Sequence, residues 1–147
     1  MKHLWIYMAA LGSVGCADTT SYKIVGDTIP PPLTSEPANP DRGHTLFSTR
    51  SDAHCVLCHS HTQVDVPFQG NLGPDLSSVA DRLSAAQIRL RLVDYDRIKA
   101  GTTMPSYYRT QGLHQVSPEF EGRTVLTALE IEDIIAFLIT DADEPNG

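Results

Sequence analysis

The stretch SDAHCVLCHSH, residues 51–61, contains two cysteines and three histidines, and its centre has the spacing C-x-x-C-H. This spacing is typical of covalent haem attachment. Two thiols separated by two residues lie on one helical turn, so both sulfurs can reach the vinyl groups along one edge of a haem. The next histidine then lies against one face of the ring with its Nε2 toward the iron. We therefore expect Cys55 and Cys58 to hold one haem c, with His59 as an axial ligand.

Three other uses of the two cysteines remain open. Cys55, Cys58, His59 and His61 are four nominal zinc ligands, but structural zinc sites usually take their second ligand pair from a separate segment. A thioredoxin-like dithiol occurs in a βαβ context, which the sequence lacks. The third alternative is a plain disulfide. Covalent haem is favoured over all three because the motif, an export signal and the small amount of core-forming sequence agree with it.

The N-terminal residues 1–17, MKHLWIYMAALGSVGCA, have the pattern of a secretory signal peptide. A lysine is followed by an apolar run from Leu4 to Leu11, which is too short to span a bilayer, and then by small residues. The pattern predicts cleavage after Ala17. Alternatively, SVGC is an imperfect lipobox that predicts a lipid anchor on Cys16. Export would place Cys55 and Cys58 in an oxidising compartment, where both thiols should be consumed.

The rest of the chain divides into a tether and one domain. Residues 18–40 contain five prolines with Thr, Ser and Asn between them, which predicts an extended linker without a core of its own. The folded domain is expected over 41–142, beginning with Asp41 as a helix N-cap. A composition of 41% hydrophobic and 20% charged residues indicates a globular domain, and a net charge of −7 argues against a nucleic-acid binder.

Helices are the only regular elements that the sequence predicts. Ser84 with Gln87 and Thr127 with Glu130 form capping boxes, each at the start of a helical pattern. The second pattern has an apolar stripe at helical spacing, namely Ile131, Ile134, Ile135 and Leu138. The segments between the helices are long and rich in Gly and Pro, which is unusual in a small domain unless they surround a ligand. The sequence predicts an all-α domain with a few helices wrapped around its haem.

Met104 is the expected ligand on the other face of the iron. Met1 and Met8 lie in the signal, so Met104 is the one methionine that the exported chain would keep. Pro105 biases it toward an extended backbone, and a thioether ligand stabilises ferrous iron. The alternatives are His114 as the ligand, or Met104 as a core side chain. Ligation by His59 and Met104 closes the iron to substrates, which favours an electron relay that is not catalytic alone.

Several of these motifs together resemble the class I cytochromes c. They are Gly43 and Phe47 in the first helix, the C-x-x-C-H motif, Gly73-Pro74, Met104-Pro105 and the last amphipathic helix. The resemblance implies that the first and last helices cross and pack. It also implies that the Pro74 carbonyl accepts the Nδ1–H of His59 and so fixes the orientation of this ligand.

A closer resemblance, over residues 41–138, is to the SoxX family, the monohaem cytochrome c subunits of the SoxAX complex of sulfur oxidation. It is carried by RLSAAQIRLRLVD and by MPSYYRTQGL with the residues after it. The resemblance implies a periplasmic protein paired in a heterodimer with a SoxA-type monohaem or dihaem cytochrome. That complex, an L-cysteine S-thiosulfotransferase, oxidatively joins thiosulfate to a cysteine of the carrier SoxYZ. Electrons then pass to a downstream cytochrome.

Two expectations about function follow from the resemblance. The chain is expected to be the electron-accepting subunit of that complex, and the alternative is a free-standing class I cytochrome c that carries electrons by itself. Tyr107, Tyr108 and Arg109 follow the proposed ligand Met104 closely. We expect this trio to contact a haem propionate or the partner, with loop packing as the alternative.

Overall fold

The computed structural model describes residues 21–140, so the expected signal peptide, Cys16 and the last two residues of the expected domain lie outside the described residues. The helices are α1 (Pro40–Ser48), α2 (Ala85–Asp94) and α3 (Ala128–Thr140). Single 3₁₀ turns lie between them: η1 (Cys55–Leu57), η2 (Val79–Asp81), η3 (Tyr95–Arg97) and η4 (Pro118–Phe120). Over 21–140 the β pairing is limited to an isolated bridge, Val25 with Thr28. The expected all-α class is confirmed.

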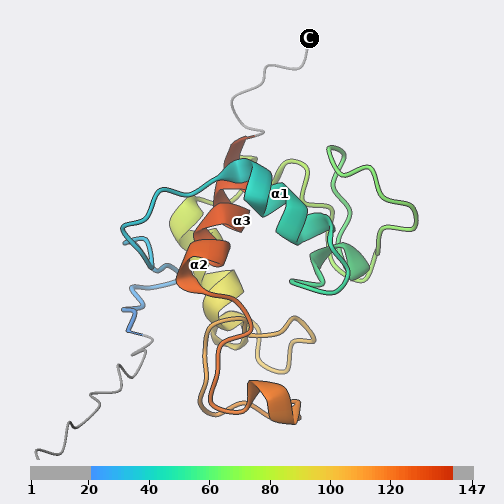
Figure 1. The fold of residues 1–147 in the computed structure, drawn as a ribbon. Helices are drawn as coiled ribbons and strands as arrows, with labels where there is room; N and C mark the ends of the chain where they lie inside the picture. The colour runs from blue at the N-terminus through green and yellow to red at the C-terminus, as the bar shows by residue number, and fades with distance from the viewer. Residues whose placement is uncertain (1–20, 141–147) are drawn as a thin grey trace, which may run out of the picture.

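Helices α1 and α3 cross and pack against each other (Figure 1). Gly43 permits this close approach, because a Cβ at this position would overlap the backbone carbonyl of Asp133. Phe47 lies one turn further along α1 and is fully buried, with its ring centroid 5.6 Å from that of Phe137. The expected packing of the first helix on the last is therefore present. No helix within 21–140 combines the length and apolar character that crossing a membrane requires.

Helices α2 and α3 begin as their sequences predict. At α2 the Ser84 side chain accepts a hydrogen bond from the Gln87 backbone, and the Gln87 side chain accepts one from the Ser84 backbone. At α3 the Thr127 N–H donates to Glu130 Oε2 at 2.7 Å, and the Glu130 N–H donates to Thr127 Oγ1 at 3.2 Å. Both capping boxes are confirmed, and the apolar stripe of α3 is buried: Ile131, Ile134, Ile135 and Leu138.

Helix α1 begins earlier than expected. Its N-cap is Asn39, whose Oδ1 accepts hydrogen bonds from the backbone N–H groups of Asp41 and Arg42 at 2.9 and 3.0 Å. Pro40 is then the first helical residue, a position where the missing N–H has no intrahelical partner to lose. Asp41 lies in the first turn, where its negative charge interacts favourably with the helix dipole. The expected N-cap at Asp41 is therefore wrong by two positions.

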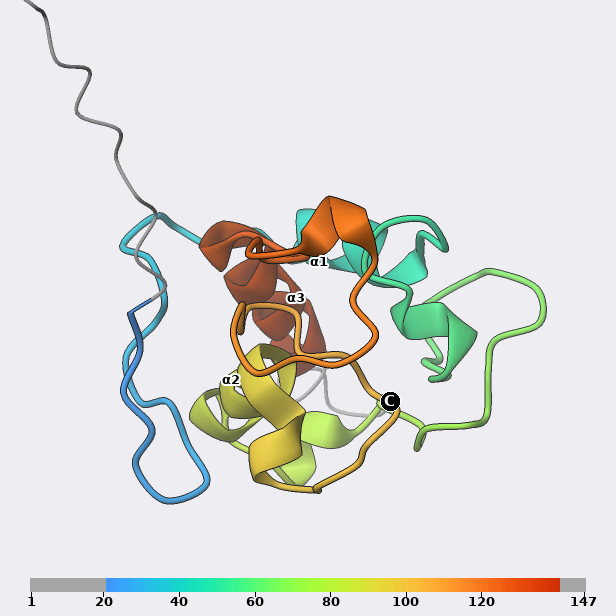
Figure 2. The same cartoon turned by 90° about the horizontal axis from the view of Figure 1, so that it is seen from below.

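Residues 21–39, here called the arm, are extended but are not a free tether. The arm runs along α2 and α3 (Figures 1 and 2) and contributes Ile29, which is fully buried, to the core. The Ile29 N–H donates to the Ala86 carbonyl at 3.0 Å, and the Leu33 N–H donates to Glu132 Oε1 at 2.8 Å. The folded part therefore begins before residue 41, contrary to the expected linker over 18–40.

A buried ion pair between α2 and α3 holds the arm. Arg89 donates two hydrogen bonds to Glu132, from Nε at 2.6 Å and from Nη2 at 2.8 Å, and both side chains are at most 7% exposed. Its Nη1 donates to the Ile29 carbonyl at 2.8 Å. A buried charge needs a complete set of partners, and here the arm backbone supplies part of that set.

Candidate functional site

The C-x-x-C-H motif forms one tight turn. The N–H groups of Cys58 and His59 both donate to the Cys55 carbonyl, at 3.1 and 2.9 Å. The turn places two thiols and an imidazole within one short loop of backbone. Cys55 is buried and Cys58 is half-buried, and no disulfide joins them.

The His59 ring has a fixed orientation and tautomer. Its Nδ1 lies 2.7 Å from the Pro74 carbonyl oxygen. A carbonyl can only accept, so Nδ1 carries the hydrogen, and in the neutral ring the lone pair that can bind a metal is on Nε2. Gly73 lies directly against the ring, because a Cβ there would overlap the imidazole. The hydrogen bond that the resemblance implies for Pro74 is present, while its role toward a haem stays a prediction.

A contact absent from the sequence prediction holds the Pro74 carbonyl in place. The Ser60 hydroxyl donates to Asp75 Oδ2 at 2.6 Å, and the Leu76 N–H donates to the Ser60 carbonyl at 2.9 Å. Hydrogen bonds from Ser60 and then from Ser77 hold the pKa of Asp75 below its usual value, so the carboxylate accepts both. The residue after His59 is thereby tied to the residues after Pro74.

The surroundings of the cysteines do not favour the zinc alternative. Burial raises the pKa of the Cys55 thiol to about 12, which does not favour a reactive dithiol, because its nucleophile must be a thiolate. Over residues 21–140, no three His, Cys, Asp or Glu side chains converge in a way that could hold a metal ion. His61, the fourth nominal ligand, is buried in the core instead, 4.6 Å from Phe137 and 5.6 Å from Phe47 by ring centroids.

Tyr107 joins the Met104 loop to the cysteine turn. Its hydroxyl donates to the Ala53 carbonyl at 2.7 Å, two residues before Cys55. Burial raises the pKa of Tyr107, so the hydroxyl keeps its proton and remains a donor. Met104, three residues before Tyr107, is half-buried against the core, and its N–H donates to Thr102 Oγ1 at 3.2 Å. The loop that carries Met104 and the turn that carries the two cysteines are therefore linked by a hydrogen bond.

The trio expected to contact a propionate or a partner has contacts within the chain. Tyr107 bonds to Ala53, and the Tyr108 ring lies 6.2 Å from that of Tyr22 in the arm. Arg109 pairs with Asp94 and Asp96 and donates to the carbonyls of Gln111 and Gly112. These contacts agree with the alternative, loop packing, and the contact with a propionate or a partner stays a prediction. Sequence reasoning missed them because Asp94 and Asp96 precede Met104 in the sequence, whereas Arg109 follows it.

These residues fit a covalently attached haem. Two free thiols share one turn, an imidazole is oriented with Nε2 available, and Met104 lies on a loop tied to the same turn. Leu57 and Leu72, near this turn, are 44% and 72% exposed, so apolar surface is available there for a large ring to cover. The donor set is that of a haem c.

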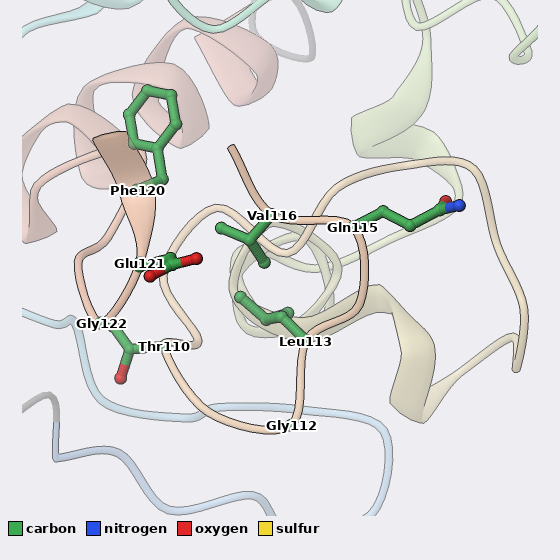
Figure 3. Close-up of a pocket in the computed structure, with 8 residues that line it drawn as sticks. All are labelled: Thr110, Gly112, Leu113, Gln115, Val116, Phe120, Glu121 and Gly122. Atoms are coloured by element: carbon green, nitrogen blue, oxygen red, sulfur yellow. The ribbon is translucent and has the colours of Figure 1, made fainter. Parts of the chain in front are cut away.

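A separate hollow lies in the segment before α3 (Figure 3), and none of the predicted haem-binding residues lines it. Apolar and polar side chains share its wall: Thr110, Gly112, Leu113, Gln115, Val116, Phe120, Glu121 and Gly122. His114, the rival iron ligand, is exposed in this segment and does not line the hollow.

Comparison with solved structures finds a chain of the crystal structure of SoxXA from P. pantotrophus. It superposes with a TM-score of 0.74 at 31% sequence identity, over 82% of this chain and 93% of that chain. The chain belongs to the SoxX family. Its fold is that of a class I cytochrome c, and it is a Sox-system cytochrome. No protein-family model matches the chain, and no curated protein sequence matches it either.

The SoxX-family match agrees with the motifs that the sequence presents from Gly43 to Leu138. The match extends over most of both chains. The roles of individual residues toward a haem are not part of that match and remain predictions.

Proposed function

We propose that this chain is the electron-accepting haem c subunit of a SoxAX-type complex, which oxidatively conjugates thiosulfate to a cysteine of the carrier SoxYZ. The observation that carries the proposal is the His59 imidazole, oriented by Pro74 and Gly73 on the same turn as Cys55 and Cys58. The similarity to a SoxXA chain supports the choice of system.

The chain would hold its haem through four side chains. Cys55 and Cys58 would form the two thioether bonds, His59 Nε2 would bind one face of the iron, and the Met104 sulfur would bind the other. A haem c with His and Met ligands accepts and releases one electron at a time at a high potential.

The protein groups around the haem would set its orientation and exclude other chemistry. Pro74 keeps the proton on His59 Nδ1, so that Nε2 stays a metal ligand. Met104, as a ligand, would keep substrates from binding the iron. Both cysteines of the exported domain would be consumed by the haem, which leaves no thiol for bond formation. The reacting cysteine must then belong to another chain.

The reaction explains why such a subunit is needed. When a carrier thiol and thiosulfate join through a new S–S bond, one proton and two electrons are released. The electrons must leave one at a time through haem, because the conjugate itself cannot keep them. We place this chain beside a SoxA-type cytochrome in a heterodimer, as the structural match to a SoxXA complex suggests. SoxYZ and a downstream cytochrome would bind transiently, in the periplasm.

A reduction assay tests the proposal. The purified ferric chain is mixed with a SoxA-type subunit, SoxYZ and thiosulfate, and haem reduction is followed by absorbance. We expect reduction with the full mixture and none when SoxYZ is omitted or lacks its acceptor cysteine. Reduction that does not depend on the partner and carrier would favour a free-standing electron carrier. No reduction in the full mixture would contradict the proposal.

A further inference from the structure

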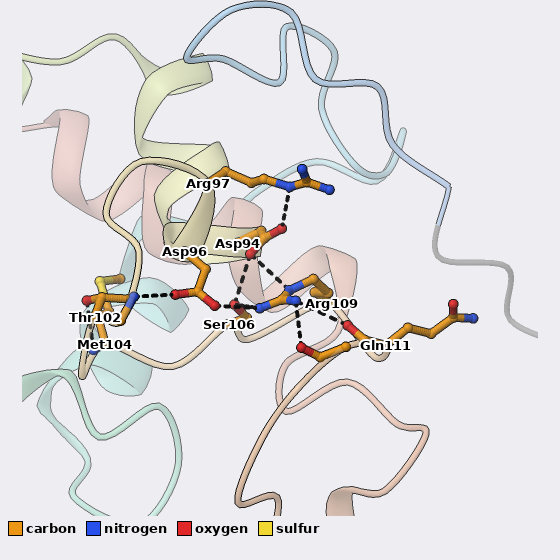
Figure 4. A network of polar contacts seen from close by, with 10 residues as sticks. Asp94, Asp96, Arg97, Thr102, Met104, Ser106, Arg109 and Gln111 are labelled. Atoms are coloured by element: carbon orange, nitrogen blue, oxygen red, sulfur yellow. Dashed lines mark hydrogen bonds and ion pairs between the residues drawn. The ribbon is translucent and has the colours of Figure 1, made fainter.

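The carboxylate of Asp94 is buried at the end of α2, where the chain leaves toward Met104. The residue is 1% exposed, and Arg109 Nε lies 2.9 Å from its Oδ1 as an ion pair without the alignment of a hydrogen bond. The Ser106 hydroxyl also donates to Oδ1, at 3.2 Å. On the other side, Arg97 Nε donates to Oδ2 at 3.3 Å. Figure 4 shows Asp94 between the two guanidinium groups.

The segment 95–106 departs from α2 and returns to the same place. The Tyr107 N–H donates to the Leu92 carbonyl at 3.0 Å, and the Arg109 N–H donates to the Val93 carbonyl at 3.3 Å. Met104 lies just before this return. The segment therefore forms a closed loop, and Asp94 is the last residue of α2 before it begins.

A second carboxylate, that of Asp96, links two parts of the loop region. Asp96 Oδ2 lies 3.1 Å from Arg109 Nη2, and Asp96 Oδ1 accepts from the Gly101 N–H at 3.2 Å. The first half of the loop is exposed from residue 96 to residue 101, so it has little apolar contact to hold it. Its closed shape depends mainly on the polar contacts at its base.

We propose that Asp94, with Arg109 and Asp96, is a clamp that positions Met104 on the iron. Arg109 is a positioning residue that acts through the loop backbone and does not touch the haem. This inference rests on the proposed function, because it needs Met104 to be the ligand. A thioether is a neutral, weak ligand, so its occupancy depends on how often the loop opens. Each contact that closes the loop lowers the population of the open state.

The test uses the full, haem-loaded ferric protein and free imidazole as a competing ligand. Arg109→Gln removes the charge that pairs with both carboxylates. We expect the apparent affinity for imidazole to rise about tenfold, the size of one lost charged contact. The weak red-end absorption of thioether-ligated ferric haem should fall in parallel. Arg109→Lys keeps the charge but loses the fork, and it should restore part of the wild-type behaviour.

Arg97→Gln is the matched control. Arg97 also contacts Asp94, but it follows Asp94 by only three residues, so this contact does not join the two ends of the loop. Its side chain is also 67% exposed. We expect less than about a twofold change in imidazole affinity for this variant, since exposed pairs contribute little. Asp96→Asn serves if Arg109→Gln does not fold, because the amide can still accept from Gly101 while losing its charge toward Arg109. An increase of about threefold is expected there.

The outcomes separate the clamp from the proposed function. If the wild type has the red-end band, and Arg109→Gln and Asp96→Asn bind imidazole no better than Arg97→Gln does, the clamp is overturned alone. If the wild type itself lacks the band, Met104 is not the ligand and both fall. Global unfolding is followed by circular dichroism in every variant. A change in imidazole affinity that only follows a loss of global stability would also overturn the clamp.

Discussion

At the scale of single residues, Gly73 decides how close the backbone comes to the His59 ring. The structure leaves no room for a Cβ at this position, and the Pro74 carbonyl that orients the ring follows directly. Gly73→Ala must displace the imidazole or the backbone. We expect the free energy of unfolding to fall by about 2 kcal/mol or more. The yield of haem-loaded protein, measured by haem staining and absorbance, should fall as well.

The control for this substitution is Gly122→Ala. Gly122 has a φ of +69° but no atom within 4 Å of a built Cβ, so only backbone strain of about 1 kcal/mol is added. Haem loading should stay near the wild-type level. Equal haem loading in Gly73→Ala and the wild type would refute the steric role given to this glycine.

Met104 is the residue on which the electron-relay account depends. Met104→Ala should abolish the red-end absorption of the ferric protein and lower its reduction potential, because a thioether favours the ferrous state. His114→Ala should keep the band, since the His114 side chain is exposed and lies ten residues after Met104. Absorbance and a redox titration measure both effects. A wild type that lacks the band, with a spectrum that changes in His114→Ala but not in Met104→Ala, would reverse the ligand assignment.

At the scale of elements, the crossing of α1 and α3 depends on Gly43. Gly43→Ala would force a methyl group onto the Asp133 carbonyl in the middle of the helix contact. We expect a destabilisation of about 3 kcal/mol, at the upper end for an overpacked core, despite the better helix propensity of alanine. Denaturant unfolding of the haem-loaded protein measures it. A variant as stable as the wild type would show that α1 and α3 can accommodate the methyl group without a loss of stability.

The buried pair Arg89–Glu132 links α2, α3 and the arm. Glu132→Gln leaves the Arg89 charge buried without its carboxylate and also weakens the bond to the Leu33 N–H. We expect a loss of about 3–5 kcal/mol in the free energy of unfolding. The double variant Arg89→Met/Glu132→Leu should recover much of it, because no charge is left buried. Additive losses in the double variant would contradict the role of the pair.

The elements also show what local sequence can predict. The two capping boxes and the α3 stripe were predictable because they depend on residues three or four positions apart. The N-cap of α1 was missed because both Asn39 and Asp41 are good capping residues, and the choice depends on Pro40 between them. The local pattern ranks them equally.

At the scale of the whole molecule, sequence reasoning failed where contacts join distant segments. The proline-rich composition of the arm correctly indicated extended backbone. It gave no sign that Ile29 fills the core or that Arg89 and Glu132 bind the arm backbone. The pairing of Arg109 with Asp94 and Asp96 was likewise missed, because both carboxylates precede the Met104 loop in the sequence. The C-x-x-C-H motif alone predicted His59 as a ligand, whereas its hydrogen bond to the Pro74 carbonyl was predictable only through the family resemblance.

The intact mass of the exported protein tests the central claim most directly, namely that the turn from Cys55 to His59 holds a haem c. The protein is isolated without reduction, its mass is measured, and the peptide that carries Cys55 and Cys58 is identified. We predict one haem bound covalently to that peptide through both cysteines. A peptide whose cysteines are free, joined in a disulfide or released from zinc would contradict the account.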